Sequence, residues 1–528
     1  MSRYRFLGLL LCGALAFLCS AASAGLRQDA AAADAARVRG DYGMAIRLYS
    51  HMLASKNLKA ADRPIALFNR GSVYLLNHEI ERAIQDFDKA ISMKPRFAEA
   101  YAYRGMGYLR SNQFGKAAQD LDHAIELKPN FPDAHYNRGL IYLLKNHLER
   151  AIEQFNKTVA LDPSYTEAYY KRGLAYALKG QFQLAIKSYD SAIERDGKYW
   201  PAFSDRGVAY YMVGDLKKAL KDYNTALQLA RGDKSNLAII YNRRGVVYRA
   251  LNDYDKARGD FKAAIDLDPD YFNAILNLGG IYLNTGQYEK AIHMFSKAID
   301  VKPDSADAFK GRASAYQAKG EVDASIVDFS HALRLKENAP DLYYDRGLSY
   351  MQRGDYERAI KDFRTSVRLK PEDPFFIRLL GQAYFAKGNF KKAAATFERE
   401  LKLSDEDPYA VLWLYIARGR AGDVDRRMLA ENAKKLEQKK WPIQLIHYYL
   451  GETTSTSLER YSKLGEPKEQ KENECQVAFH MGEYALLNRS QRKAKRLLKH
   501  AGKICPTSMP ERMIAPAELR RLKEGKNN

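Results

Sequence analysis

The sequence contains few of the residues on which catalysis and metal binding usually depend. Among its 528 residues there are only four cysteines, and the ten histidines are scattered along the chain. None of the patterns H-E-x-x-H, G-x-S-x-G or a phosphate-binding G-K-[ST] loop occurs. We therefore expect no enzymatic activity, no cofactor and no bound metal.

Long apolar runs are also absent, apart from one at the start of the chain. The run from Phe6 to Leu18 follows Arg3 and Arg5, and Ala22-Ser23-Ala24 then matches an A-x-A cleavage site. A membrane-spanning helix needs about 20 apolar residues, so a signal peptide cleaved after Ala24 is favoured over a retained anchor. We expect a periplasmic or secreted protein without a transmembrane helix in the mature chain.

Two of the four cysteines, Cys12 and Cys19, lie in this first segment. Neither follows the small residues that precede a lipid-modified cysteine, because Leu9-Leu10-Leu11 and Ala16-Phe17-Leu18 stand before them. The mature chain is therefore expected to begin near Gly25 without a lipid.

Acidic residues are outnumbered by basic ones, with 64 Asp and Glu against 85 Lys and Arg, so the formal net charge is +21. Such a charge favours anionic partners. Export and the lack of a nucleic-acid-binding motif make nucleic acid a poor candidate. An acidic protein, a cell-wall polymer or an anionic lipid surface fits better.

The main regularity of the sequence is a repeat. The pattern R-G-x-x-Y begins at Arg70-Gly71 and recurs every 34 residues at Arg104-Gly105, Arg138-Gly139 and Arg172-Gly173. The glycine position continues through Gly207, Gly245, Gly279, Ala313, Gly347 and Gly381, and only the step from Gly207 to Gly245 is longer. The chain therefore contains ten complete units.

The residue pattern of each unit predicts a pair of helices that cross closely. In the first unit, small residues occupy positions 83 and 90, and a large aromatic residue, Phe87, lies between them. A proline often closes the unit, as at Pro95. This pattern resembles the tetratricopeptide repeat, which implies an all-α, right-handed superhelical solenoid of helical hairpins, here with a C-terminal helical extension.

The repeat pattern divides the chain into five parts. We expect a signal peptide (1–24), an N-terminal capping repeat and link (25–63), ten tandem repeats (64–405), a degenerate repeat (406–440) and a C-terminal helical segment (441–528). The insertion at 231–236 is expected to lengthen a loop, and the charged stretch 466–474 is expected to be a mobile link.

The last hairpin carries the two remaining cysteines, Cys475 and Cys505. Because the start of one helix and the end of the next lie side by side in a hairpin, these cysteines are predicted to form a disulfide. The alternative is a metal site completed by His480 and His500. Residues five apart on a helix diverge in direction, so the disulfide is favoured.

The C-terminal segment also resembles the NlpI-type bacterial envelope proteins, through spaced residues that include Trp441-Pro442, Tyr449-Leu450-Gly451, Phe479, Gly482, Leu486, Ala494, Ala501, Glu511, Ala515, Glu518 and Leu522. The resemblance implies an adaptor that brings envelope proteases and peptidoglycan-cleaving enzymes together. This chain has more repeats than such proteins and lacks their lipid-anchoring cysteine context.

Two surfaces are candidates for binding. Positions that line the concave groove of tetratricopeptide folds are apolar in the third to fifth units, namely Tyr136, Leu140, Leu143, Tyr170, Leu174, Leu178, Tyr211 and Met212. This strip suits a peptide with apolar anchors, although packing against neighbouring helices is an equal alternative. The second surface is basic, with a solvated helix face as the alternative to a binding role: Arg492, Lys493, Lys495, Arg496, Lys499 and Lys503.

Overall fold

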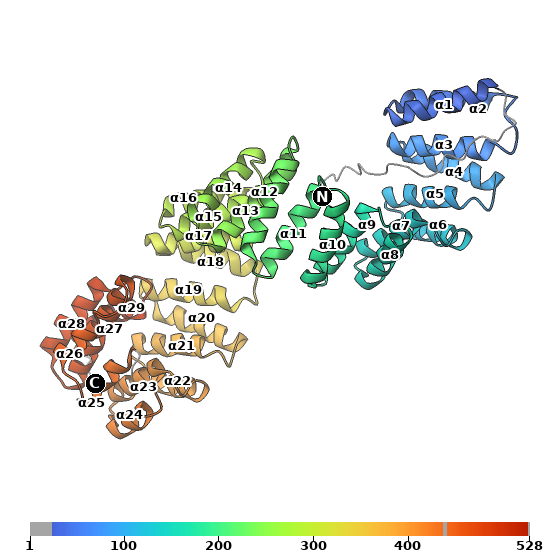
Figure 1. Ribbon diagram of the computed structural model, residues 1–528. Helices are drawn as coiled ribbons and strands as arrows, with labels where there is room; N and C mark the ends of the chain where they lie inside the picture. Colours follow the sequence, from blue (N-terminus) through green and yellow to red (C-terminus); the bar gives the residue numbers. More distant parts are fainter. Residues whose placement is uncertain (1–23, 437–440, 526–528) are drawn as a thin grey trace. The chain divides into compact units, whose positions relative to one another are not determined.

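A computed structural model describes residues 24–436 and 441–525, and within these ranges the chain forms helices and no strands (Figure 1). The predicted signal peptide lies outside the described residues, apart from Ala24, where the first helix begins. None of the described helices is both long enough and apolar enough to cross a membrane.

The chain divides into two compact units between Asp260 and Phe261. The helices of the first unit are α1 (Ala24–Val38), α2 (Tyr42–Ala54), α3 (Arg63–Leu76), α4 (Ile80–Met93), α5 (Ala98–Arg110), α6 (Phe114–Leu127), α7 (Pro132–Leu144), α8 (Leu148–Leu161), α9 (Thr166–Leu178), α10 (Phe182–Arg195), α11 (Trp200–Met212), α12 (Leu216–Leu229) and α13 (Lys234–Ala250).

Helix α14 (Tyr254–Leu267) contains the boundary. The second unit continues with α15 (Phe272–Asn284), α16 (Tyr288–Val301), α17 (Ala306–Lys319), α18 (Val322–Leu335), α19 (Pro340–Arg353), α20 (Tyr356–Leu369), α21 (Pro374–Lys387), α22 (Phe390–Leu403), α23 (Pro408–Arg420), α24 (Arg426–Ala433), α25 (Ile443–Leu450), α26 (Ser455–Tyr461), α27 (Pro467–Leu487), α28 (Gln491–Ile504) and α29 (Pro510–Lys523).

In seven of the repeats, a close crossing of the two helices of the hairpin requires the repeat glycine. A Cβ atom on Gly139 of α7 would lie 2.7 Å from Cε1 of Phe155 in α8, which is shorter than a van der Waals contact. Equivalent contacts of 2.5–2.9 Å occur in six other repeats, at Gly71–Phe87, Gly173–Tyr189, Gly207–Tyr223, Gly279–Phe295, Gly347–Phe363 and Gly381–Phe397. The ring of the second helix therefore fills the volume that the glycine leaves open.

The small residues of the pattern are buried as predicted. Ala83 and Ala90 are both fully buried in α4, on either side of Phe87. At the N-terminus, Ala33, Ala36, Ala45 and Tyr49 form a small core of α1 and α2 with exposed fractions of 0–1%. The same rule of small residues around a large ring thus operates outside the regular repeats.

The prediction that the insertion at 231–236 lengthens a loop is wrong. Helix α12 ends at Leu229 and α13 begins at Lys234, the same spacing as between Met93 and Ala98 in an ordinary repeat. The extra residues instead extend α13 to 17 residues, against 13 in α11. Because four residues make about one helical turn, the insertion keeps the connection short and adds a turn.

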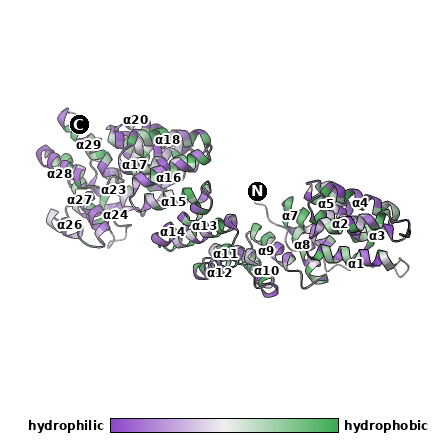
Figure 2. Ribbon diagram, turned by 90° about the horizontal axis from the view of Figure 1, so that it is seen from above, coloured by the Kyte–Doolittle hydropathy of each residue, from purple (hydrophilic) through white to green (hydrophobic). Residues whose placement is uncertain are grey.

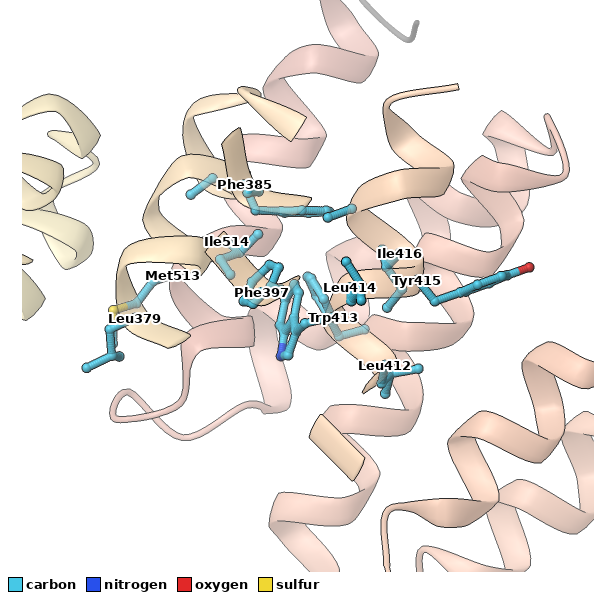
Figure 3. Close-up of a cluster of buried hydrophobic side chains, with 14 of the residues drawn as sticks. Leu379, Phe385, Phe397, Leu412, Trp413, Leu414, Tyr415, Ile416, Met513 and Ile514 are labelled. Carbon is cyan, nitrogen blue, oxygen red and sulfur yellow. The ribbon is translucent and has the colours of Figure 1, made fainter. Parts of the chain in front are cut away.

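The C-terminal part differs from prediction at the stretch 466–474, which is helical rather than a mobile link. Helix α27 begins at Pro467, and Glu466 and Glu469 form a reciprocal capping box at its start. The hydrophobic core of this C-terminal part surrounds Trp413 of α23. The ring centre of Trp413 lies 5.3 Å from that of Phe385 and 5.7 Å from that of Phe397 (Figure 3).

Two neighbouring glycines of α15 provide a test of the crossing. A Cβ on Gly279 would lie 2.8 Å from Cε1 of Phe295, whereas a Cβ on Gly280 would meet nothing within 4 Å. Gly279→Ala should therefore destabilise the protein by about 1–2 kcal/mol, because overpacking exceeds the gain in helix propensity. Gly280→Ala should stabilise it by about 0.5–1 kcal/mol.

Both variants would be compared with the wild type by denaturant unfolding followed by circular dichroism. Equal shifts of the unfolding midpoint in the two variants would contradict the close crossing at Gly279.

Candidate partner-binding surfaces

The repeated arginines hold neighbouring helices together. Arg206 of α11 donates two hydrogen bonds of 2.7 Å to Asp222 of α12 and one of 2.5 Å to Asp190 of α10. Bidentate pairing with the residue 16 positions later recurs at Arg70, Arg104, Arg244, Arg312 and Arg346. These arginines are thus paired with carboxylates of the second helix of their own hairpin.

Three residues of the predicted groove lie in the interior. Tyr136, Leu140 and Tyr170 are 6%, 6% and 4% exposed. The ring centre of Tyr136 lies 5.0 Å from that of Tyr165, and that of Tyr170 lies 5.3 Å from that of Tyr199. Their assignment as partner-binding residues is therefore wrong, because the next repeat covers these apolar side chains.

The remaining predicted groove residues are at least partly accessible. Leu143, Leu174 and Tyr211 are half-buried, whereas Leu178 and Met212 are 57% and 54% exposed. Leu144, at 64% exposed, occupies the equivalent position in α7. Leu144, Leu178 and Met212 are the last residues of α7, α9 and α11, so they present one exposed apolar side chain per repeat. We call these three residues the apolar row.

A chain of charged residues lies on the first helices of the fourth to sixth repeats, α9, α11 and α13, two positions before the repeat glycine. Arg243 Nη1 lies 2.7 Å from Asp205 Oδ1, and the Tyr170 hydroxyl donates a 2.7 Å hydrogen bond to Asp205 Oδ2. Burial lowers the pKa of Lys171, at the equivalent position in α9, while Asp205 and Glu167 act in the opposite direction.

This charged chain was not predicted from the sequence, because its residues lie at a position of the first helix that does not belong to the expected groove. The signal was present in the sequence, since Lys171, Asp205 and Arg243 occupy one position of consecutive repeats with alternating charge. Such groups can orient a bound peptide through its polar backbone or charged side chains.

The side of a repeat that its first helix forms is here called the first-helix face. In the ninth and tenth repeats, α29 covers this face of α19 and α21. Leu348, Met351, Leu379 and Gln382 of α19 and α21 share a small cavity with Pro510 and Met513 of α29. Arg521 donates a 2.7 Å hydrogen bond to the carbonyl oxygen of Ala386. Figure 3 shows Met513 and Ile514 beside Leu379 and Phe385. This end of the array is therefore closed by the chain itself.

The predicted disulfide joins Cys475 of α27 to Cys505 at the end of α28, with α-carbons 4.8 Å apart. The sequence predicted Cys475 at the start of its helix. Because α27 begins at Pro467, Cys475 instead lies within the helix. His480 is fully buried while His500 is exposed, so the two imidazoles do not complete a site with the bridge. No metal-binding group of three His, Cys, Asp or Glu occurs among the described residues.

Buried ionisable residues connect the last hairpin to α23 and α29. Arg420 Nη1 lies 2.7 Å from Glu483 Oε2 and 2.8 Å from Glu518 Oε2. His480 Nε2 lies 3.9 Å from Glu511 Oε1. Burial lowers the pKa of His480 to about 3, so this imidazole is uncharged near neutral pH. Burial also raises the pKa of Glu511 to about 7, so this carboxyl group changes its charge around neutral pH.

All six residues of the predicted basic surface are exposed on α28: Arg492, Lys493, Lys495, Arg496, Lys499 and Lys503. The opposite side of the helix carries Ala494, Leu498 and Ala501, each with an exposed fraction of 0%.

Comparison with known proteins agrees with this architecture. Family models described as tetratricopeptide repeat match residues 30–100, 166–199, 202–270, 248–315 and 344–410, and a model described as TPR repeat matches 105–146 and 139–180. The chain belongs to the tetratricopeptide-repeat proteins. The NlpI-type resemblance of the C-terminal segment has no counterpart among these matches. No curated protein matches the chain.

Solved tetratricopeptide-type structures share limited identity with this chain. YrrB, described as having an unusual peptide-binding site, is 24% identical, with 36% of this chain and 95% of YrrB covered and a TM-score of 0.32. PilF of Pseudomonas aeruginosa is 17% identical, with 39% and 93% covered and a TM-score of 0.36. The Cut9–Hcn1 structure of the APC/C is 17% identical, with 94% and 96% covered and a TM-score of 0.40.

The disulfide should stabilise the last hairpin. It closes a loop with a sequence separation of 30, for which loop entropy gives roughly 3–4 kcal/mol. Replacing both cysteines by serine should lower the denaturant midpoint of the C-terminal unit by a corresponding amount, and reduction should do the same to the wild type. A reductant that shifts the double variant as much as the wild type would contradict this assignment.

Proposed function

We propose that this tetratricopeptide-repeat protein is an exported, non-enzymatic scaffold that binds partner proteins on the first-helix face of its third to fifth repeats. The observation that carries the proposal is the apolar row of Leu144, Leu178 and Met212, which is exposed in every one of these repeats. The charged chain of Lys171, Asp205 and Arg243 lies on the first helices of the fourth to sixth repeats.

The chemistry of this face suits a peptide or helix of another protein. Exposed apolar side chains at a regular interval supply anchors that lose water on binding, and nearby charges select orientation. Such a surface gains its energy from contact and needs no reacting group.

The location and the clients are part of the proposal. The basic, apolar and A-x-A segments of residues 1–24 favour export, and the C-terminal resemblance to NlpI-type proteins favours envelope proteases or peptidoglycan-processing enzymes as partners. Mass spectrometry of the purified native protein should find Gly25 as the first residue. An intact N-terminus in the cytosolic fraction would contradict export.

Variants of the apolar row test the binding surface. Leu144→Glu, Leu178→Glu and Met212→Glu combined should reduce the recovery of specific partners at least tenfold, because charged groups remain hydrated at the contact. A matched control is Leu161→Glu, Leu335→Glu and Leu403→Glu, which changes exposed leucines at the ends of second helices α8, α18 and α22.

The measurement is affinity capture with cross-linking from the cell-envelope fraction, with circular dichroism to check folding. The same partners in the same amounts from the wild type, the apolar-row variant and the control would reject the first-helix face as the binding surface.

A further inference from the structure

Helix α28 concentrates positive charge without neutralising it. Six of its 14 residues are Lys or Arg, and the chain contains no Asp or Glu from Tyr484 to Pro510. None of the six cations forms an ion pair with a described residue, in contrast to Arg206, which contacts two carboxylates. This charge therefore does not serve the packing of the hairpin.

The cations form one continuous face. With about 100° of rotation per residue, Arg492, Lys495, Arg496, Lys499 and Lys503 fall within a sector of about 100°, opposite the buried Ala494, Leu498 and Ala501. They extend over about 17 Å of the helix axis, at 1.5 Å per residue. We call these five residues the basic face.

Maintaining the basic face works against local stability. Its members are three or four residues apart, and like charges at this spacing destabilise a helix. The buried side of α28 and the disulfide at Cys505 hold the helix in place nevertheless. A local cost that brings no structural gain is typical of a functional surface.

We propose that the basic face attaches the protein to the surface of a lipid bilayer with anionic phosphate headgroups. Helix α28 packs mainly on α27 and α29, and Figure 2 shows it at the margin of the C-terminal helices. Its cations lie on the side opposite the buried Ala494, Leu498 and Ala501. A convex helix face meets a flat surface, whereas a flexible polyanion strand is usually held in a groove.

The absence of apolar anchors separates a bilayer from an acidic protein. Within the described residues 465–525, no large hydrophobic side chain is exposed, whereas protein partners gain most of their binding energy from such anchors. Electrostatic attraction to anionic lipid requires none, and each Lys or Arg near the surface contributes about fivefold in affinity.

The test compares two variants of the full chain that lose the same charge. Arg496→Gln, Lys499→Gln and Lys503→Gln neutralise the basic face, and Lys187→Gln, Lys217→Gln and Lys221→Gln neutralise exposed lysines of α10 and α12. Binding is measured by co-sedimentation with phosphatidylcholine vesicles, with and without phosphatidylglycerol. The basic-face variant should bind anionic vesicles about 100-fold more weakly, while the control variant stays within a few-fold of the wild type.

Three results would overturn the proposal. If both variants lost the same amount of binding to anionic vesicles, the net charge of the protein and not the basic face would determine the affinity. Equally strong binding to neutral vesicles would exclude an electrostatic contact. Tighter binding to a poly-glutamate peptide or soluble polyphosphate than to anionic vesicles would assign the basic face to another anion. The apolar-row variant should still bind anionic vesicles. The proposal for the basic face and the proposal for the partner-binding surface can therefore be rejected separately.

Discussion

The close approach of two helices at the repeat glycine is the constraint on which the rest of the structure depends. Without a Cβ on Gly139 or Gly173, the ring of Phe155 or Tyr189 lies directly against the helix backbone. That contact sets the crossing within each hairpin and buries the largest side chain of the second helix. A hairpin alone still leaves apolar surface uncovered, so stacking of hairpins follows from the same contact.

The arginine beside each glycine uses this geometry to join hairpins. Arg206 reaches carboxylates on the second helix of its own repeat and of the preceding repeat, because all three helices are held at a fixed distance. The pair with Asp222 is bidentate and orients the two helices of one hairpin, whereas the single bond to Asp190 links this hairpin to the preceding one. The charge of these arginines is thereby balanced within the array.

The first-helix face of the ninth and tenth repeats differs from that of the third to fifth repeats. In the ninth and tenth repeats, α29 covers the face through Met513, and Arg521 binds the carbonyl oxygen of Ala386. In the third to fifth repeats, Leu144, Leu178 and Met212 stay exposed at positions of the same type. The same repeated surface is thus covered by a helix of this chain in the ninth and tenth repeats and carries exposed apolar side chains in the third to fifth repeats.

The sequence by itself determined the helical hairpins, their period, the buried alanines and rings, and the disulfide, because each depends on residues at fixed short spacings. It did not determine which groove residues stay accessible. Tyr136 and Tyr170 are interior because the next repeat covers them, and the four extra residues of the sixth repeat extend α13 by a turn. Only the tertiary structure decides such matters, since burial depends on which side chains of other helices occupy the surrounding space.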